Sequence, residues 1–507
     1  MIIPHPTRLT RRAGSFAPAG GLRVLAGRGA EGPARLLAGY LPRPSIHSGP
    51  GIRLALAPDA RFGPEGYELD VTPVGALLTA ATEAGLRNGV QTVRQLVPLH
   101  GPPRLPCLHV RDAPRLPWRG VLLDVARHFL PPAFLREFVD LLALHKYNVL
   151  HLHLTDDQGW RIEIDGRPRL TEVGAWRAES MVGPAGSGVF DGVPHGGFYT
   201  QRELRDLVGF AAERGVRIVP EIDFPGHVRA ALAAYPELGN RPETPLPVWT
   251  EWGISPDILG VHDGALAFCR EVLTQVAAVF PAPHLHVGGD ECPTTQWAAS
   301  PVAREKAARL GLSDPAELHP WFLSELHGVI VGLGRQAVCW DETGHAAGRL
   351  PPEMVVTAWR DAAHGALAVA RGHRVVMAPH TSTYFDYRQS EEPGEPPREP
   401  VTTLEDVYRF DPLAGGLPVS DGTRPGILGT QAQLWTEHAP TPDHVRHLAF
   451  PRLCALAERA WSPPDRGYAD FRQRLAGHLE RLRALDALPK ERVRFAGALP
   501  VSGKTVP

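Results

Sequence analysis

From residue 117 onward, the sequence alternates short apolar runs with segments of helical periodicity. The runs have the length of buried strands and each ends in polar or aromatic residues; they occupy residues 119–125, 148–154, 216–222, 284–289, 336–340, 354–358, 374–378 and 427–434. This βα alternation is typical of a parallel sheet, and eight such strands are the number that closes a (β/α)8, or TIM, barrel. We therefore predict an α/β protein built on a TIM barrel.

The chain is long enough for a second domain, because it has 507 residues and single cores stop growing near about 250–300. A proline-rich run at residues 102–117 marks the best boundary. Before it, strand-like segments at 21–25 and 52–56 and a helix-like stretch at 74–96 indicate a small α/β domain. We predict this N-terminal domain over residues 1–115, and the barrel with a C-terminal helical extension over residues 116–507.

The composition excludes several classes of partner. A formal net charge of −2 creates no field that would gather nucleic acid or an anionic membrane, so a neutral ligand is expected. The five cysteines lack CxxC spacing, which predicts buried thiols rather than disulfides or a zinc site, and we expect no metal or other cofactor. No apolar run resembles a signal peptide or a membrane span, so we expect a cytoplasmic protein; its oligomeric state stays open.

Polar and aromatic residues, mostly carboxylates and aromatics, lie at the carboxyl ends of the predicted strands, the end of a barrel where active sites lie. They are Arg127, His128, Asp156, Asp157, Glu221, Asp223, His227, Asp290, Glu291, Trp340, Trp359, Tyr384, Asp386, Trp435 and Glu437. Tryptophans beside carboxylates and an arginine suit a pyranose, whose C–H face stacks on indole while charged groups bind its hydroxyls. His151 and His153 are weak metal candidates that we expect to pack inside the barrel. The predicted ligand is a carbohydrate.

Several longer motifs carry a resemblance to a known family. They are RGVLLDVARHF (119–129), YNVLHLHLTDDQGWR (147–161), IVPEIDFPGH (218–227), HVGGDE (286–291), VCWDE (338–342), TAWR (357–360), STYFD (382–386) and QLWTE (433–437). With these motifs in this order, the sequence resembles glycoside hydrolase family 20, the β-N-acetylhexosaminidases. The resemblance implies a retaining exo-enzyme that removes terminal N-acetylglucosamine or N-acetylgalactosamine, with the sugar's own acetamide as nucleophile and an oxazolinium intermediate.

The resemblance implies three catalytic residues. Glu291 is the general acid and later the base, Asp290 holds the acetamide N–H, and Tyr384 donates its hydroxyl to the acetamide oxygen. Neighbouring carboxylates suit these separate tasks, because successive side chains on a strand diverge. Gly288 and Gly289 before them would let the backbone approach a ligand closely. We also expect burial and the Asp290 charge to raise the pKa of Glu291, as an acid near neutrality requires.

The same resemblance implies the residues that bind the sugar. A box around the acetyl methyl and the sugar face consists of Trp340, Trp359 and Trp435. Arg127 and Glu437 point toward O3 and O4, and Asp386 points toward O6. Asp156 and His227 form a pair that supports Glu291 from behind. The remaining tryptophans that we considered are expected to pack in the core: Trp160, Trp252, Trp321 and Trp461.

Two other functions compete with this interpretation. A chitinase-like enzyme that cuts inside chains would carry the pattern Asp-x-x-Asp-x-Asp-x-Glu, which is absent from the sequence. A catalytically silent sugar-binding barrel would be expected to lose the acid or the acetamide-orienting pair, whereas Asp290, Glu291 and Tyr384 are all present. Fold alone does not separate these functions.

Overall fold

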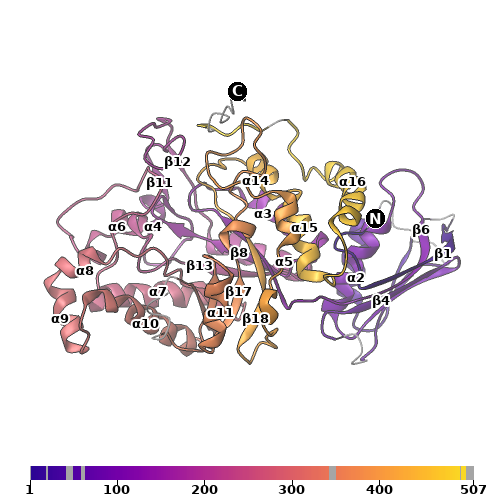
Figure 1. Cartoon of the computed structure of the whole chain (residues 1–507), viewed down its shortest axis with the longest axis horizontal. Coiled ribbons are helices and arrows are strands. Elements are labelled where there is room, and N and C mark those ends of the chain that lie inside the picture. Colours follow the sequence, from indigo (N-terminus) through magenta and orange to yellow (C-terminus); the bar gives the residue numbers. More distant parts are fainter. Residues whose placement is uncertain are drawn as a thin grey trace, which may run out of the picture.

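The computed structural model describes residues 2–18, 21–41, 50–58, 63–341, 350–491 and 493–497. Glu342, the last residue of the motif at 338–342, lies outside this part of the chain. Eight parallel strands close into a barrel, and the N-terminal domain lies to one side of it, at the right in Figure 1. The predicted TIM barrel with a preceding domain is confirmed.

Each barrel strand lies within two residues of its predicted start. The strands are β7 (Trp118–Asp124), β8 (Val149–His153), β13 (Arg217–Glu221), β14 (His284–His286), β15 (Gln336–Trp340), β16 (Val355–Ala358), β17 (Arg374–Met377) and β18 (Gly426–Leu434). The fourth strand is shorter than predicted, because Gly288 and Gly289 have φ values of 67° and 88° and turn the chain out of the sheet.

Helices between the strands cover the outside of the barrel. The longer ones are α3 (Pro132–Leu144), α5 (Gln201–Glu213), α7 (Asp263–Val279), α9 (Pro301–Arg309), α10 (Leu318–Gly332), α11 (Ala362–Ala370), α14 (Pro442–Ala449), α15 (Arg452–Trp461) and α16 (Tyr468–Ala484). Local sequence sets where they begin: Thr200 and Glu203 form a reciprocal capping box at the start of α5. Shorter helices lie in the loops, including α6 (Arg229–Ala234), α12 (His380–Thr383) and α13 (Leu404–Arg409).

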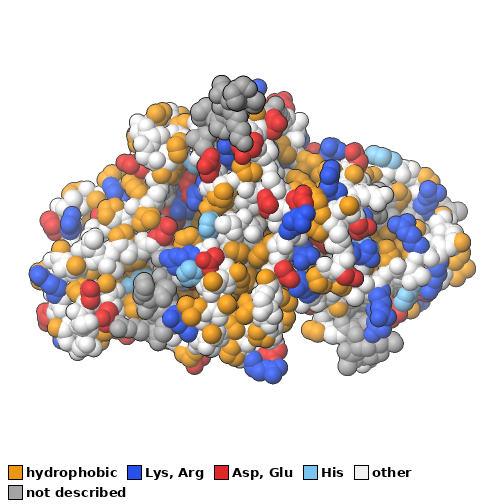
Figure 2. All heavy atoms as spheres, viewed as in Figure 1, with side chains coloured by type: hydrophobic (Ala, Val, Ile, Leu, Met, Phe, Trp, Pro, Cys, Tyr) orange, Lys and Arg blue, Asp and Glu red, His pale blue; other side chains and the backbone are white. Residues whose placement is uncertain are grey.

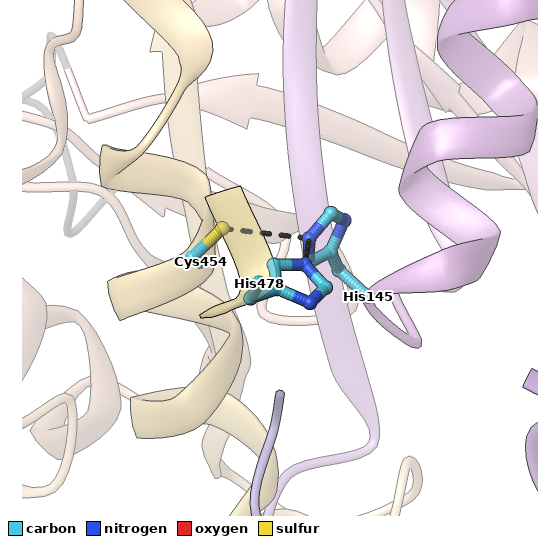
Figure 3. Close-up of side chains that lie close together, drawn as sticks. All are labelled: His145, Cys454 and His478. Carbon is cyan, nitrogen blue, oxygen red and sulfur yellow. Dashed lines mark hydrogen bonds between the residues drawn. The ribbon is translucent and has the colours of Figure 1, made fainter. Parts of the chain in front are cut away.

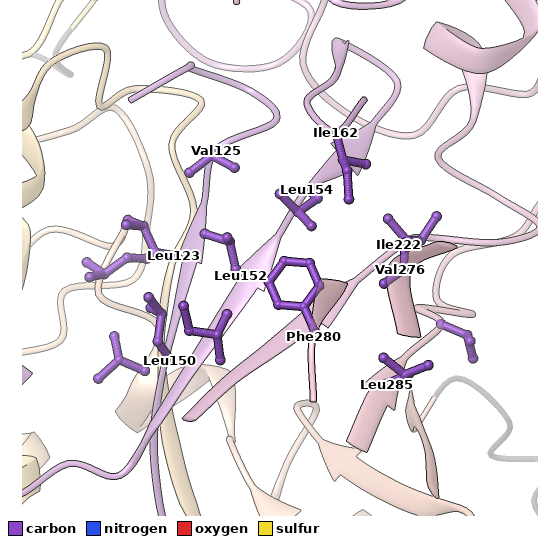
Figure 4. Packing of buried hydrophobic residues seen from close by; sticks show 14 of the residues in the cluster. Leu123, Val125, Leu150, Leu152, Leu154, Ile162, Ile222, Val276, Phe280 and Leu285 are labelled. Atoms are coloured by element: carbon purple, nitrogen blue, oxygen red, sulfur yellow. The ribbon is translucent and has the colours of Figure 1, made fainter. Parts of the chain in front are cut away.

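The two faces of each strand have different surroundings. On β8, Leu150 and Leu152 belong to the main apolar core, where Figure 4 shows Leu152 beside Phe280, the residue that follows α7. Inside the barrel, a separate apolar layer closes the amino-terminal end; it consists of Trp118, Val149, Val219, Val338, Val355, Val376 and Leu428. His151 and His153 share the inward face of β8 with Val149 and are buried, as expected.

The N-terminal domain is a six-stranded sheet in the order β1-β6-β4-β5-β3-β2, packed with two helices. Its elements are β1 (Arg8–Phe16), β2 (Val24–Ala26), α1 (Glu31–Tyr40), β3 (Ile52–Leu56), β4 (Tyr67–Thr72), β5 (Gly75–Ala80), α2 (Glu83–Leu96) and β6 (Leu105–Asp112). The helix-like prediction for 74–96 is wrong in its first part. Burial alternates along β5, and the helix begins only after Thr82, whose side chain accepts a hydrogen bond from the Gly85 N–H.

The described surface mixes charges of both signs. Figure 2 shows Lys and Arg side chains interspersed with Asp and Glu on the face in view. Among the described helices, none combines the length and the apolar composition that a membrane crossing demands. Four of the five cysteines are buried and Cys292 is half-buried.

A buried ion pair joins the two domains. Lys146, after α3, places its Nζ 2.8 Å from Asp112 Oδ2 and 2.9 Å from the Tyr67 hydroxyl, both in the N-terminal domain. The indole N–H of Trp461, at the end of α15, donates to the other Asp112 oxygen at 2.9 Å. Burial lowers the pKa of Lys146 while the Asp112 charge raises it, and the net shift is downward. The Asp112 carboxylate therefore connects its own strand, β6, with the segment after α3 and with α15.

We predict that Asp112→Asn lowers the free energy of unfolding by about 3–5 kcal/mol, because Lys146 is left with no counter-charge in a buried position. Urea denaturation followed by fluorescence measures the change. Asp70→Asn is the control, since Asp70 pairs with Arg12 at 2.6 Å on the surface and should change stability by less than about 1 kcal/mol. Equal effects of the two substitutions would contradict the prediction.

Candidate active site

A cavity of about 430 Å³ opens at the carboxyl ends of the barrel strands. Eight of the predicted site residues line it: Arg127, Asp156, Asp290, Glu291, Trp359, Tyr384, Trp435 and Glu437. The other three, His227, Trp340 and Asp386, lie directly behind them in contact with lining residues. A larger hollow of about 700 Å³ lies at the opposite ends of β8 and β13, beside the N-terminal domain, where barrels do not place their catalytic groups.

Asp290 and Glu291 lie in the loop after β14 rather than on the strand. The glycines before them serve close packing: a Cβ on Gly288 would lie 1.8 Å from Asp223 Oδ1, and one on Gly289 would lie 2.9 Å from Leu323. Glu291 itself has a φ of 44°, a conformation that L-residues rarely adopt. The turn, and not strand pleating, therefore separates the two carboxylates.

Glu291 contacts a charged histidine. Its Oε2 lies 3.6 Å from His227 Nε2, and its side chain is 36% exposed to the cavity. Burial raises the pKa of Glu291, but His227, Arg127 and Arg398 lower it more, so the net shift is downward. The expected upward shift of the Glu291 pKa is therefore wrong. The reason is that a cation, rather than only Asp290 and tryptophans, adjoins this carboxylate.

Asp156 is the partner that holds His227. His227 Nδ1 lies 3.1 Å from Asp156 Oδ1, while Arg127 Nη2 and His153 Nε2 lie 3.0 Å and 2.8 Å from Asp156 Oδ2. Burial lowers the pKa of His227, but Asp156 and Asp157 outweigh it and raise the pKa well above its usual range. The predicted Asp156–His227 pair is thus present in the geometry, with its imidazole held as a cation.

Asp290 adjoins a second buried acid. Asp223, after β13, accepts a hydrogen bond from the Gly289 N–H at 3.1 Å. A carboxylate oxygen of Asp223, a ring nitrogen of His227 and a carboxylate oxygen of Asp290 all lie within 4.8 Å of one another. Burial and the Asp290 charge raise the pKa of Asp223 well above its usual range. This shift favours the protonated form of Asp223 beside the Asp290 carboxylate.

Aromatic residues form the wall opposite these acids. Tyr384, Trp340 and Trp435 belong to one buried cluster against which Trp359 packs. Trp340 and Trp435 have ring centroids 5.9 Å apart, and Tyr384 lies 6.3 Å from both Trp359 and Trp435. Burial, Asp386 and Asp290 raise the pKa of Tyr384 well above its usual range, so its hydroxyl remains a hydrogen-bond donor.

A polar layer supports the tryptophans from inside the barrel. Glu221 accepts from the Trp340 indole N–H at 2.7 Å, and its oxygens also lie 2.6 Å from His153, 2.9 Å from His151 and 3.0 Å from His286. Both ring nitrogens of His153 face carboxylate oxygens, so both must donate and this ring is an imidazolium. The orientation of Trp340 is thus set by a buried charge.

The sequence analysis missed several residues that line the cavity: Trp252, Tyr387, Arg398 and His438. Tyr387 and His438 directly follow predicted site residues and are found by extending those motifs by one position. Trp252 and Arg398 come from long loops without a strand-end pattern, so nothing in their local sequence marks them. Trp252, which we expected in the core, is buried but contributes to the cavity wall.

Arg398 bridges the two carboxylates predicted to hold hydroxyls. Its Nε lies 2.9 Å from Asp386 Oδ2, and its Nη1 donates to Glu437 Oε1 at 2.8 Å. Burial raises the pKa of Glu437, but Arg398 and Arg127 lower it to about 2. Burial raises the pKa of Asp386 to about 7, with Glu437 adding to the rise and Arg398 opposing it. Glu437 is therefore ionised near neutral pH, whereas Asp386 titrates in this range.

Clusters of histidine, cysteine and acid side chains raise the question of a metal. Away from the cavity, His145, Cys454 and His478 meet in the core between α3, α15 and α16 (Figure 3). The Nε2 atoms of His145 and His478 are 2.9 Å apart, and the centroids of the two rings are 5.0 Å apart. The difference between these distances is about the sum of the two ring radii, so the two nitrogens point at each other. A metal would need both lone pairs to converge on a third point. This contact is a hydrogen bond.

Comparison with known families matches both parts of the chain. Residues 116–464 match the catalytic domain of glycosyl hydrolase family 20, and residues 1–113 match domain 2 of the same family.

Individual relatives are similar over most of the chain. It is 37% identical to a β-hexosaminidase of Porphyromonas gingivalis, covering 82% of this chain but 53% of that protein. It is 38% identical to a β-hexosaminidase of Akkermansia muciniphila, covering 82% of this chain and 83% of that protein. Among solved structures, the exo-β-N-acetylglucosaminidase of Vibrio harveyi, crystallised with N-acetylglucosamine, superposes with a TM-score of 0.85 at 30% identity, covering 97% and 78% of the two chains.

We predict that His227→Gln shifts the titration of Glu291 to higher pH, because the neighbouring cation that lowers its pKa is removed. Carboxyl-carbon NMR of glutamate-labelled protein follows this titration, with Glu291→Gln assigning the signal. His364→Gln is the control, since His364 pairs with the exposed Asp361 and is not among the groups that lower the pKa of Glu291. A titration that stays in place in His227→Gln would show that this histidine does not set the Glu291 charge.

Proposed function

Because the chain belongs to glycosyl hydrolase family 20, the family of the β-N-acetylhexosaminidases, we propose that it is a retaining exo-enzyme acting on terminal non-reducing N-acetylglucosamine or N-acetylgalactosamine, with the substrate's acetamide as nucleophile. The observation that carries the mechanism is the unequal setting of the two adjacent carboxylates. Glu291 is partly exposed beside His227, whereas Asp290 lies beside the buried acid Asp223 and influences Tyr384. The surroundings of Glu291 suit proton transfer to a leaving group, and those of Asp290 suit stabilisation of a developing charge.

In the first step, Glu291 gives its proton to the glycosidic oxygen as the bond from that oxygen to the anomeric carbon breaks. The neighbouring cations favour the ionised form of Glu291. A bound sugar removes the water that still reaches its side chain, and desolvation raises the pKa of a carboxyl group. We infer that substrate binding itself brings Glu291 toward the protonated state that this step requires.

The acetamide oxygen attacks the anomeric carbon as the leaving group departs, and an oxazolinium ring forms. The Tyr384 hydroxyl, kept protonated, donates to that oxygen and orients it. Asp290 accepts a hydrogen bond from the amide N–H and stabilises the positive charge that develops on the nitrogen, while the raised pKa of Asp223 favours a proton on that neighbouring acid. Preorganised charges of this kind act strongly in a water-poor site.

The aromatic wall supplies the remaining requirement. Trp359 and Trp435 line the cavity and Trp340 lies behind them, which supports an apolar enclosure for the acetyl methyl. Exclusion of water strengthens the polar contacts within. In the second step, Glu291 takes a proton from one water, whose oxygen bonds to the anomeric carbon and reopens the ring. Two displacements at one carbon return the β configuration.

We predict that β-glycosides lacking the 2-acetamido group are nearly inert, since they lack the nucleophile. A thiazoline copy of the bicyclic intermediate should bind about 10²–10⁸-fold more tightly than the free sugar, as analogues close to a transition state do. Initial rates on paired nitrophenyl glycosides and inhibition assays measure both effects.

The same mechanism predicts the stereochemistry and the effects of Asp290→Asn and Tyr384→Phe. Proton NMR of early turnover should show the β anomer, and each variant should lose discrimination in favour of the acetamide. Early release of the α anomer, or a sugar ester trapped on a carboxylate, would overturn the mechanism while leaving the family assignment intact.

We predict that Glu291→Gln slows hydrolysis of natural disaccharides by about 10²–10⁴-fold, because acid assistance to a poor leaving group is lost. Glycosides whose leaving group needs no proton should be affected less in the first step. Steady-state kinetics on one substrate of each kind measures the difference. Full activity of this variant on a disaccharide would remove Glu291 from the role.

A further inference from the structure

A cavity of about 700 Å³ lies between the N-terminal domain and the barrel, at the end of the barrel opposite to the active site. Arg87 of α2 lines it from one domain, and Val208 of α5 and Arg217 of β13 line it from the other. Its volume falls within the range of about 300–1,000 Å³ that is typical of small-molecule sites. The cavity is therefore large enough for a ligand that contacts both domains.

Arg217, at the start of β13, has an unusual setting in this cavity. Its Nε is closed to solvent, and no described residue accepts a hydrogen bond from it. By contrast, the buried Arg119 of β7 donates to the carbonyl oxygens of Lys146 and Leu116, each at 2.8 Å, and pairs with Glu65. Buried donors in folded proteins are nearly always satisfied, so an exception calls for a water, an ion or a ligand.

The acids on the cavity wall already have cations of their own. Glu65 pairs with Arg119, and Glu83 pairs with Arg87 at 2.6 Å. Of the charged residues that line the described cavity, only Arg217 lacks an ion-pair partner. Burial lowers the pKa of Arg217 and the charge of Glu65 raises it, with a net downward shift. The Arg217 guanidinium is thus a positive charge without a direct counter-charge.

The side chains below Arg217, in the floor of the barrel, do not supply that counter-charge. The guanidinium carbon lies 5.6 Å from the centre of the Trp118 ring, and the ring of His284 lies 5.2 Å from Trp118. Burial lowers the pKa of His284 to about 3, and the charges of Arg217 and Arg374 contribute to this shift. These neighbours are aromatic or cationic, so an anion can reach Arg217 only from the cavity.

The apolar part of the cavity wall defines the rest of the ligand. It includes Val208 and Ala212 of α5 and Pro281 and Ala282 after α7. Small-molecule sites commonly combine apolar walls with a few charged anchors. A carboxylate is planar, carries a single charge and fits the donor fork of a guanidinium. A phosphate carries more charge than one unpaired cation balances, and the acids on the cavity wall would repel it.

We propose that the cavity between the two domains binds a small monocarboxylate with an apolar body, and that Arg217 pairs with the carboxylate of this ligand. The site lies at the end of the barrel opposite to Glu291, so it is distinct from the active site and independent of the proposed function. Because both domains line the cavity, a bound ligand would also stabilise the interface between them.

Binding of 4-phenylbutyrate and of its neutral amide tests the proposal without an assay of hydrolysis. Ligand-observed proton NMR with the full chain measures the dissociation constant of each probe. We expect saturable binding of the carboxylate and about 10- to 100-fold weaker binding of the amide, as for the loss of a hydrogen bond between charged groups. Arg217→Met should weaken binding of the carboxylate by a similar factor and leave binding of the amide unchanged.

Two further variants test whether the probe occupies this cavity. Ala212→Trp places a large side chain in the cavity from the exposed side of α5 and keeps Arg217, and it should abolish binding of both probes. Arg409→Met is the matched control, because Arg409 on α13 forms an exposed pair with Glu405 and should bind both probes as wild type does.

Thermal melting separates a binding role of Arg217 from a structural one. Arg217→Met should melt close to the wild-type temperature, because this side chain forms no ion pair within the described part of the protein. Arg119→Met should melt lower, because it leaves the Glu65 carboxylate without its cation. A large loss of stability in Arg217→Met would identify a structural arginine and contradict the proposal; Ala212→Trp tests occupancy of the cavity separately.

Three results of the NMR titrations would overturn the proposal. They are the absence of saturable binding to wild type at millimolar 4-phenylbutyrate, equal affinities for the carboxylate and the amide, and an unchanged affinity in Arg217→Met. Inorganic phosphate provides the test of ligand class: if it displaced 4-phenylbutyrate at a lower concentration than unlabelled carboxylate does, the site would not be one for a monocarboxylate.

Discussion

The buried carboxylate of Asp156 connects three segments that lie on or directly after three different barrel strands. It accepts from Arg127 after β7, from His153 on β8 and from His227 after β13. A buried charge is tolerated only when it is paired, so these contacts fix the relative positions of the three segments. Arg127 in turn lies over the Trp435 ring and His227 lies beside Glu291. The geometry of the cavity therefore depends on this one acid.

The interior of the barrel is layered, and each layer has a distinct physical task. Five valines with Trp118 and Leu428 close the amino-terminal end. Above them, Glu221 with His151, His153 and His286 forms a charged layer without access to solvent. This layer orients the indole of Trp340, and the cavity opens above it. Because this layer is rigid, the irregular loops at the carboxyl ends of the strands present their side chains in fixed positions.

Most of the architecture was predictable because it follows from local patterns. Apolar runs of strand length and amphipathic helices repeat along the chain, and parallel strands bring their carboxyl ends to one face. The prediction failed at 74–96, where a strand and a helix share one apolar segment. For the site, residues next to strand ends were identified, but Trp252 and Arg398 were not. Their loops reach the cavity only through tertiary packing.

The sequence by itself determined the fold class and which acids and aromatics gather at the mouth of the barrel, because strand periodicity and motif order are local properties. Only the tertiary structure decided the charge on those residues and their access to a ligand. The downward pKa shift of Glu291 depends on His227, which is distant in sequence, and the burial of Asp386 depends on Arg398 from a separate loop. Desolvation and Coulomb interactions act through space, so they depend on neighbours that no local pattern specifies.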